Sequence, residues 1–121
     1  MRIADVSGCN FTITRIETDA QGRGDVRAKV KAVCNGFSGA NKSVWFDRLE
    51  VDRFISDLRA LDESRDGSTT LETMSPGECV LTLCNSDQLG HIHLDVSIAR
   101  AVHYFGETDH FRCRVRFEVD P

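Results

Sequence analysis

Apolar and polar residues alternate along most of the chain. The clearest segments are residues 26–32, 92–98 and 111–119, where every second residue is apolar and those between are polar or charged. Shorter stretches of the same kind begin at Phe11 and at Leu81. A repeat of two is typical of strands with one buried and one solvated face, and such strands usually form antiparallel sheets. The pattern therefore predicts a mostly antiparallel β protein.

One segment has a helical period instead. Its apolar residues fall on a single stripe, and they are Val51, Phe54, Ile55, Leu58 and Leu61. Asp47 with Glu50 three residues later predicts a capping box at the start of the helix. We predict one amphipathic helix over about residues 48–61, packed on the sheet, because a single apolar stripe must be covered. The fold class is then α+β, with a sandwich-like or strongly curved antiparallel sheet.

The length of the chain and the lack of a linker indicate one domain. The 121 residues suit a single domain, 1–121. The chain has two prolines, no low-complexity linker and no internal repeat, and residues 21–24 predict a hairpin turn. No apolar run approaches the roughly 20 residues of a membrane-spanning helix, so we expect no membrane contact and a cytoplasmic location.

The cysteines and Trp45 are expected to have structural rather than chemical roles. The five cysteines contain no C-x-x-C, which disfavours zinc-ribbon and redox motifs. We expect free thiols in a reducing cytosol, with Cys79 and Cys113 buried among apolar neighbours. Trp45, beside Phe46 and just before the helix, is interpreted as an anchor between helix and sheet.

His91-x-His93 is the sharpest chemical motif. Residues two apart on a strand point the same way, so both imidazoles, extended by Asp95, offer a legitimate set of metal ligands. The simpler interpretation is a solvated strand face, since Ile92 and Leu94 form the buried set, and we favour it. A small metal-dependent enzyme on this face is kept as the alternative function.

Other catalytic and cofactor motifs are missing from the sequence. It has no G-x-S-x-G, no HExxH, no phosphate-binding loop and no dinucleotide fingerprint. We therefore expect no cofactor and no enzymatic activity.

Basic residues form two rows. The first is Arg27, Lys29 and Lys31, and the second is Arg112, Arg114 and Arg116. If their strands are neighbours, the rows make one basic face that binds an anion, a nucleic acid or an acidic partner. The other interpretation, favoured for most of these side chains, is that acidic groups on paired strands offset them. The formal net charge of −4 makes nucleic acid an unlikely ligand. Periodicity does not give strand order, so whether the rows merge stays open.

Several segments together resemble a known family. They are Ser43–Phe46 leading into the helix, the strand Thr70–Met74, Ser75–Glu78 opening the next strand, Gly90–Ile92, and the closing Val115–Pro121. This pattern resembles the WapI family of immunity proteins and related small bacterial proteins. It covers roughly residues 26–121, with little to match in the first 25 residues.

The resemblance implies a cytoplasmic, non-enzymatic protein that binds and neutralises a toxin delivered by a competing cell. It defines no binding residue. Because toxin nucleases are commonly basic, exposed acidic groups are candidate contacts. They are Asp52, Asp57, Glu72, Glu78 and Asp87. Self-association through an exposed strand edge remains a further alternative.

Overall fold

Strands precede and follow a single helix in the described part of this chain. A computed structural model describes residues 2–4, 8–85 and 87–119. In this part of the chain the elements are β1 (Arg2–Ala4), β2 (Asn10–Thr18), β3 (Val26–Cys34), β4 (Phe37–Phe46), α1 (Arg48–Ser64), β5 (Ser68–Glu72), β6 (Cys79–Asn85), β7 (Ile92–Tyr104) and β8 (Glu107–Glu118).

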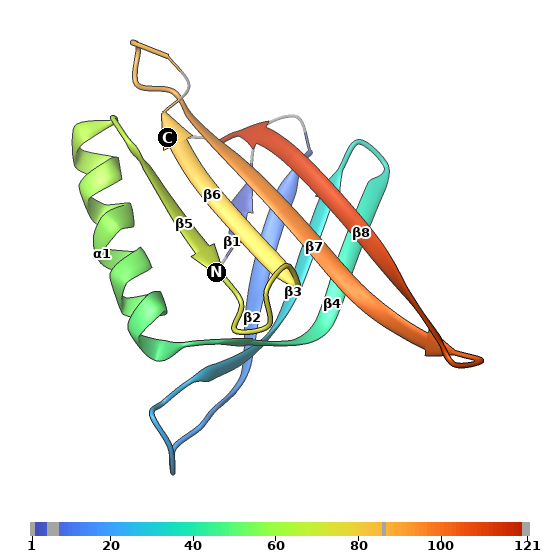
Figure 1. The fold of residues 1–121 in the computed structure, drawn as a ribbon. Coiled ribbons are helices and arrows are strands. Elements are labelled where there is room, and N and C mark those ends of the chain that lie inside the picture. The colour runs from blue at the N-terminus through green and yellow to red at the C-terminus, as the bar shows by residue number, and fades with distance from the viewer. Residues whose placement is uncertain (1, 5–7, 86, 120–121) are drawn as a thin grey trace.

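The strands form two four-stranded sheets, in the orders β1-β2-β3-β4 and β5-β6-β7-β8. Every pairing is antiparallel and joins strands that are consecutive in the chain. The sheets cross each other, with the helix beside β5 (Figure 1). The predicted α+β class, antiparallel and sandwich-like with one helix, is confirmed.

The inner faces of both sheets contribute to one core. Phe11 and Val30 of the first sheet and Leu81, Leu94 and Val96 of the second have 0% exposure. Each is the apolar member of an alternating pair, so the period of two directs one row of each strand inward. Burying a side chain of this size contributes about 1.5–3 kcal/mol. The shared core holds the two sheets together.

The helix has an N-cap that the sequence predicts. The Asp47 carboxylate accepts hydrogen bonds from the backbone N–H groups of Leu49, at 2.8 Å, and Glu50, at 3.4 Å. The Glu50 side chain binds Arg53 at 3.0 Å. Arg53 also donates to the Thr70 carbonyl of β5, at 2.6 Å, which ties the helix to the sheet edge. The helix continues to Ser64, three residues past the predicted end, and stops at Arg65 in the left-handed region, φ 56°.

β4 was not predicted, because a bulge breaks its alternation. Ala28 pairs with Val44 and Val30 with Asn41, so β4 carries one extra residue between these pairs. The buried positions then change phase, and one of them holds the polar Asn41, 6% exposed. Trp45 consequently faces outward and is 36% exposed. The predicted Trp45 anchor is wrong, and the neighbouring Phe46 is buried instead.

Two of the cysteines are bonded to each other. Cys9 and Cys34 form a disulfide between the β2 and β3 ends of the first sheet, so the expectation of free thiols is wrong for this pair. Cys79, Cys84 and Cys113 are free. Cys79 is fully buried as predicted, and this burial raises the pKa of its thiol to about 12. Cys113 is half-buried.

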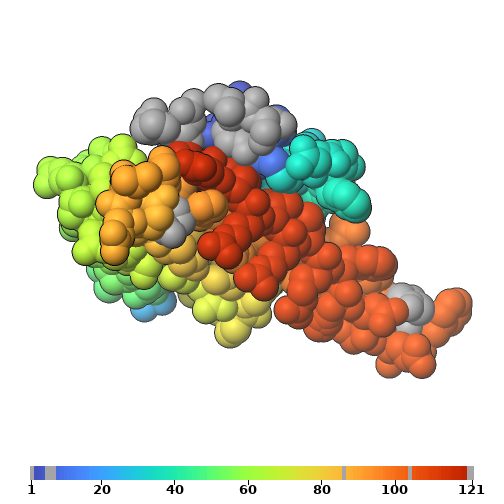
Figure 2. Space-filling model, turned by 90° about the horizontal axis from the view of Figure 1, so that it is seen from above, coloured from blue at the N-terminus to red at the C-terminus, as the bar shows by residue number. Residues whose placement is uncertain are grey.

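The strands β7 and β8 are the longest elements of the second sheet, and their hairpin extends beyond the rest of the molecule (Figure 2). Among the described residues, no helix combines the length and apolarity needed to cross a membrane.

Candidate functional site

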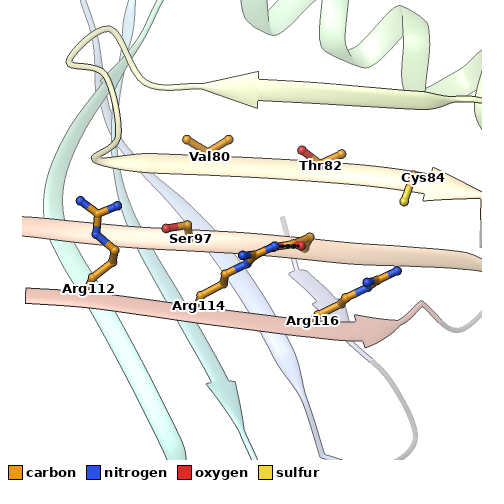
Figure 3. Close-up of a pocket in the computed structure, with 8 residues that line it drawn as sticks. Val80, Thr82, Cys84, Ser97, Arg112, Arg114 and Arg116 are labelled. Carbon is orange, nitrogen blue, oxygen red and sulfur yellow. Dashed lines mark hydrogen bonds and ion pairs between the residues drawn. The ribbon is translucent and has the colours of Figure 1, made fainter.

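An open hollow of about 490 Å³ lies on the outer face of β6, β7 and β8. We call this surface the arginine face. It is lined by Val80, Thr82, Cys84, Asp95, Ser97, Arg112, Arg114 and Arg116. Figure 3 shows the three arginines side by side along β8, extending toward the small side chains of β6 and β7. The arginine face is a basic surface with a shallow floor.

The period of two on β8 builds this face. Val115 and Phe117 are buried in the core, so the arginines between and beside them project to the outside. In the ladder, Ser97 of β7 is paired with Arg114, and Asp95 with Arg116. The small side chains of β6 and β7 leave the space over which the longer arginines extend.

Asp95 is the acidic group that lines this hollow. Its carboxylate accepts two hydrogen bonds from the Arg114 guanidinium, at 2.7 and 3.0 Å (dashed in Figure 3). These bonds, together with the charge of Arg116, lower the pKa of Asp95 below its ordinary value, although partial burial opposes them. Arg112 and Arg116 form no ion pair with another described residue. The arginine face therefore keeps two guanidinium groups available for an anionic partner.

The two basic rows do not merge. Arg27, Lys29 and Lys31 lie on β3 of the first sheet, whereas the three arginines lie on β8 of the second. Arg27 is bound to Glu17 of β2 at 2.7 Å, so the predicted offset by a neighbouring strand holds there and at Arg114. Asp95 also lies opposite Arg116, but neither Arg112 nor Arg116 has an ion pair among the described residues, which leaves the β8 row as the basic surface of interest.

The structure does not bring His91, His93 and Asp95 together as metal ligands. Asp95 is bound to Arg114, while His91 lies before β7 and contacts Asp87 at 2.5 Å. His93 lies opposite Cys84 in the ladder, and its Nδ1 is buried without a hydrogen-bond partner among the described residues. Over the same residues, no group of three or more His, Cys, Asp and Glu side chains is placed to hold a metal ion. Nothing here supports the metal alternative.

His91 is expected to titrate above its ordinary pKa of about 6.5. The hydrogen bond and the charge of Asp87 raise the pKa of His91, and Glu118 adds to the effect. The charged pair therefore stabilises the fold below pH about 6.5, and this contribution is lost as the pH rises through the raised value. An NMR titration of the His91 ring should show the shift, and Asp87→Asn should reduce it.

The matched control for this titration is Asp52→Asn, which removes a carboxylate from the exposed face of the helix. It should leave the His91 titration unchanged. A His91 pKa at or below about 6.5 in the unmodified chain would contradict the prediction.

Four of the five acidic candidates have partners within the chain. Asp57 binds Arg53 at 2.8 Å, and Glu72 accepts a hydrogen bond from the backbone N–H of Gly77. The remaining contacts are those of Glu78 with Asn41 and of Asp87 with His91. These groups lie on the helix, at the end of β5, in the turn between β5 and β6, and in the loop before β7.

The sequence interpretation missed the floor of the hollow. Val80, Thr82 and Cys84 alternate with the buried Leu81 and Leu83. Their positions on one strand face were readable from that alternation. Their position beside the arginines was not, because strand order is not encoded in the period.

These features define a small two-sheet protein with a charged, open surface. The model of the Immunity protein WapI-like family matches residues 3–121. The chain belongs to this family. The match includes most of the N-terminal 25 residues that the resemblance had left outside, consistent with the pairing of β2 along β3. Neither the curated proteins nor the solved structures contain a match.

Proposed function

We propose that this protein is an immunity protein that neutralises a cognate toxin by direct binding, without a catalytic step. The observation that carries the proposal is the family match over residues 3–121. The site supports it, because an open hollow on a sheet face suits a protein surface better than it suits a small substrate.

The arginine face is the contact surface that the charges favour. Arg112 and Arg116 are exposed and lack an ion-pair partner among the described residues, while Asp95 holds Arg114 in position. Arginine is enriched at protein interfaces and binds carboxylates through two parallel hydrogen bonds. The proposed partner surface is therefore an acidic patch of the toxin domain, whatever the net charge of the whole toxin.

Co-expression with the toxin domain encoded by the adjacent gene tests this function. With a catalytically inactive toxin, the two chains should co-elute as a stable complex, and with the active toxin, this protein should restore growth. A monodisperse protein that neither binds the toxin nor restores growth would contradict the proposal.

Replacing two arginines tests whether the arginine face contacts the toxin domain. The double variant Arg112→Ala/Arg116→Ala should raise the Kd for the toxin domain at least about tenfold and reduce the salt dependence of association. Isothermal titration at two salt concentrations measures both effects.

The other sheet provides a matched control in Lys29→Ala/Lys31→Ala, which removes two exposed cations from β3. This variant should bind like the unmodified chain. Equal losses in both double variants would show that only net charge matters and would remove the arginine face from the proposal.

A cytoplasmic location is part of the proposal, since a toxin acting inside the cell must be met there. The Cys9–Cys34 disulfide is of a kind more typical of oxidising compartments. Fractionation of cells with thiol labelling of the recovered protein measures location and redox state together.

A further inference from the structure

The hairpin of β7 and β8 extends past the sheet to which it belongs. The last β6 residue paired with β7 is Cys79, opposite Ile98. Beyond that pair, residues 99–104 pair only with residues 107–112, and we call this segment the ribbon. Six residues of strand span about 20 Å. The ribbon forms the projection in Figures 1 and 2.

The base of the ribbon is fixed to the body of the protein. The buried Asn41 side chain of β4 donates to the Ala99 carbonyl at 2.9 Å, and the Ala99 N–H donates to the Glu78 carbonyl at 2.9 Å. Along the ribbon, His103 Nδ1 and Thr108 Oγ1 are 3.0 Å apart across the two strands. The ribbon is thus a positioned element, which lowers the entropy lost on binding.

The tip of the ribbon carries a phenylalanine in an unfavourable position. Phe105 and Gly106 form the two-residue turn, with φ of 50° and 75°. Phe105 is 100% exposed. Positive φ is uncommon for residues other than glycine and is disfavoured for a bulky side chain. Because the Phe105 ring is fully exposed, it also contributes no apolar burial to the fold.

The turn of a second hairpin in the same chain carries the residues that usually occupy positions of positive φ. The turn between β3 and β4 is also two residues long, with φ of 51° at Asn35 and 84° at Gly36. Asn-Gly is the favoured pair for this turn, because asparagine tolerates positive φ. The φ of Phe105 matches that of Asn35, yet the chain places an aromatic ring there. Violations of local preference of this kind are expected at functional sites.

We infer that Phe105 is an apolar anchor, which the ribbon inserts into a concave apolar pocket of the toxin domain. This inference rests on the proposed function and adds a second contact to it. The ribbon continues the strands of the arginine face, and Arg112 lies at its base, so one toxin surface meets both. A projecting tip reaches into a cleft that a flat sheet face does not enter. Aromatic side chains that fill partner pockets dominate the affinity of many interfaces.

The test uses Phe105→Asn in the full chain. Because asparagine suits the backbone of this turn, the variant should melt at or above the temperature of the unmodified protein. Its Kd for the inactive toxin domain, measured by isothermal titration, should rise at least about 30-fold. Phe105→Leu keeps apolar bulk and should lose less affinity.

Phe37→Asn is the matched control, since Phe37 lies at the start of β4 beside the other hairpin turn and is 77% exposed. It should bind the toxin domain normally. Unchanged affinity of Phe105→Asn would overturn the anchor while leaving toxin binding by the unmodified chain intact. Failure of the unmodified chain to bind would instead overturn the proposed function.

Two further results would assign the tip to another occupant and overturn the inference. One is a mass in sedimentation that falls from dimer to monomer on Phe105→Asn, which would make the tip a contact between copies. The other is co-sedimentation of the unmodified protein, but not of the variant, with vesicles of phosphatidylcholine and phosphatidylglycerol.

Discussion

Serine at both Cys9 and Cys34 is expected to lower the free energy of unfolding by about 3 kcal/mol. The disulfide closes a loop with a sequence separation of 25 residues. In the loop-entropy account, the unfolded chain regains this closure entropy when the bond is lost, which gives about 3 kcal/mol for a loop of this size. For a chain of this length, that corresponds to a fall in melting temperature of about 10 °C.

Thermal and urea unfolding, each with and without reductant, measure the effect. Reductant should destabilise the unmodified protein and leave the double variant unchanged. Cys84→Ser is the matched control, because Cys84 is free and lies on the outer face of β6. It should change stability by less than about 0.5 kcal/mol. A double variant as stable as the unmodified chain under oxidising conditions would contradict the prediction.

Alanine at Gly39 is expected to destabilise the fold by about 3 kcal/mol, at the upper end of the usual cost of overpacking. Gly39 of β4 lies directly against Cys113 of β8, between the two sheets. A Cβ at this position would be 2.8 Å from the Cys113 Sγ and closer still to the Cys113 Cβ. The sheets must separate to admit it, which weakens the packing of the shared core.

A double-mutant cycle isolates that contact. Cys113→Gly removes the opposing side chain, so Gly39→Ala/Cys113→Gly should lose less stability than the sum of the two single changes. Ser38→Ala, at the exposed neighbouring position, controls for alanine on this strand and should stay within about 0.5 kcal/mol. Strict additivity in urea unfolding would show that Gly39 and Cys113 do not constrain each other.

Local patterns predicted the elements that obey them. The stripe from Val51 to Leu61 produced the helix, and Asp47 capped it as expected. The alternation separated inner from outer residues on β3, on β7 up to Ile98 and at Val115 and Phe117 of β8, but not at Phe111, which is 59% exposed. These predictions agree with the structure because each depends only on the geometry of one helix or strand.

Elements that break the local pattern were missed for equally physical reasons. The bulge in β4 moves the buried positions out of phase, which hid the strand and exchanged the roles of Trp45 and Phe46. Arg65 ends the helix in a left-handed conformation that asparagine or glycine would have signalled.

The sequence by itself determined the buried rows of the regularly alternating strands, where the one helix lies and which family the chain resembles. Only the tertiary structure decided that Cys9 meets Cys34, that the two basic rows lie on different sheets, and that Phe105 stands at the end of a projecting ribbon. The reason is that a period of two fixes the face on which a side chain lies but not the strand beside it. Contacts between strands are set by register and packing among residues far apart in the chain.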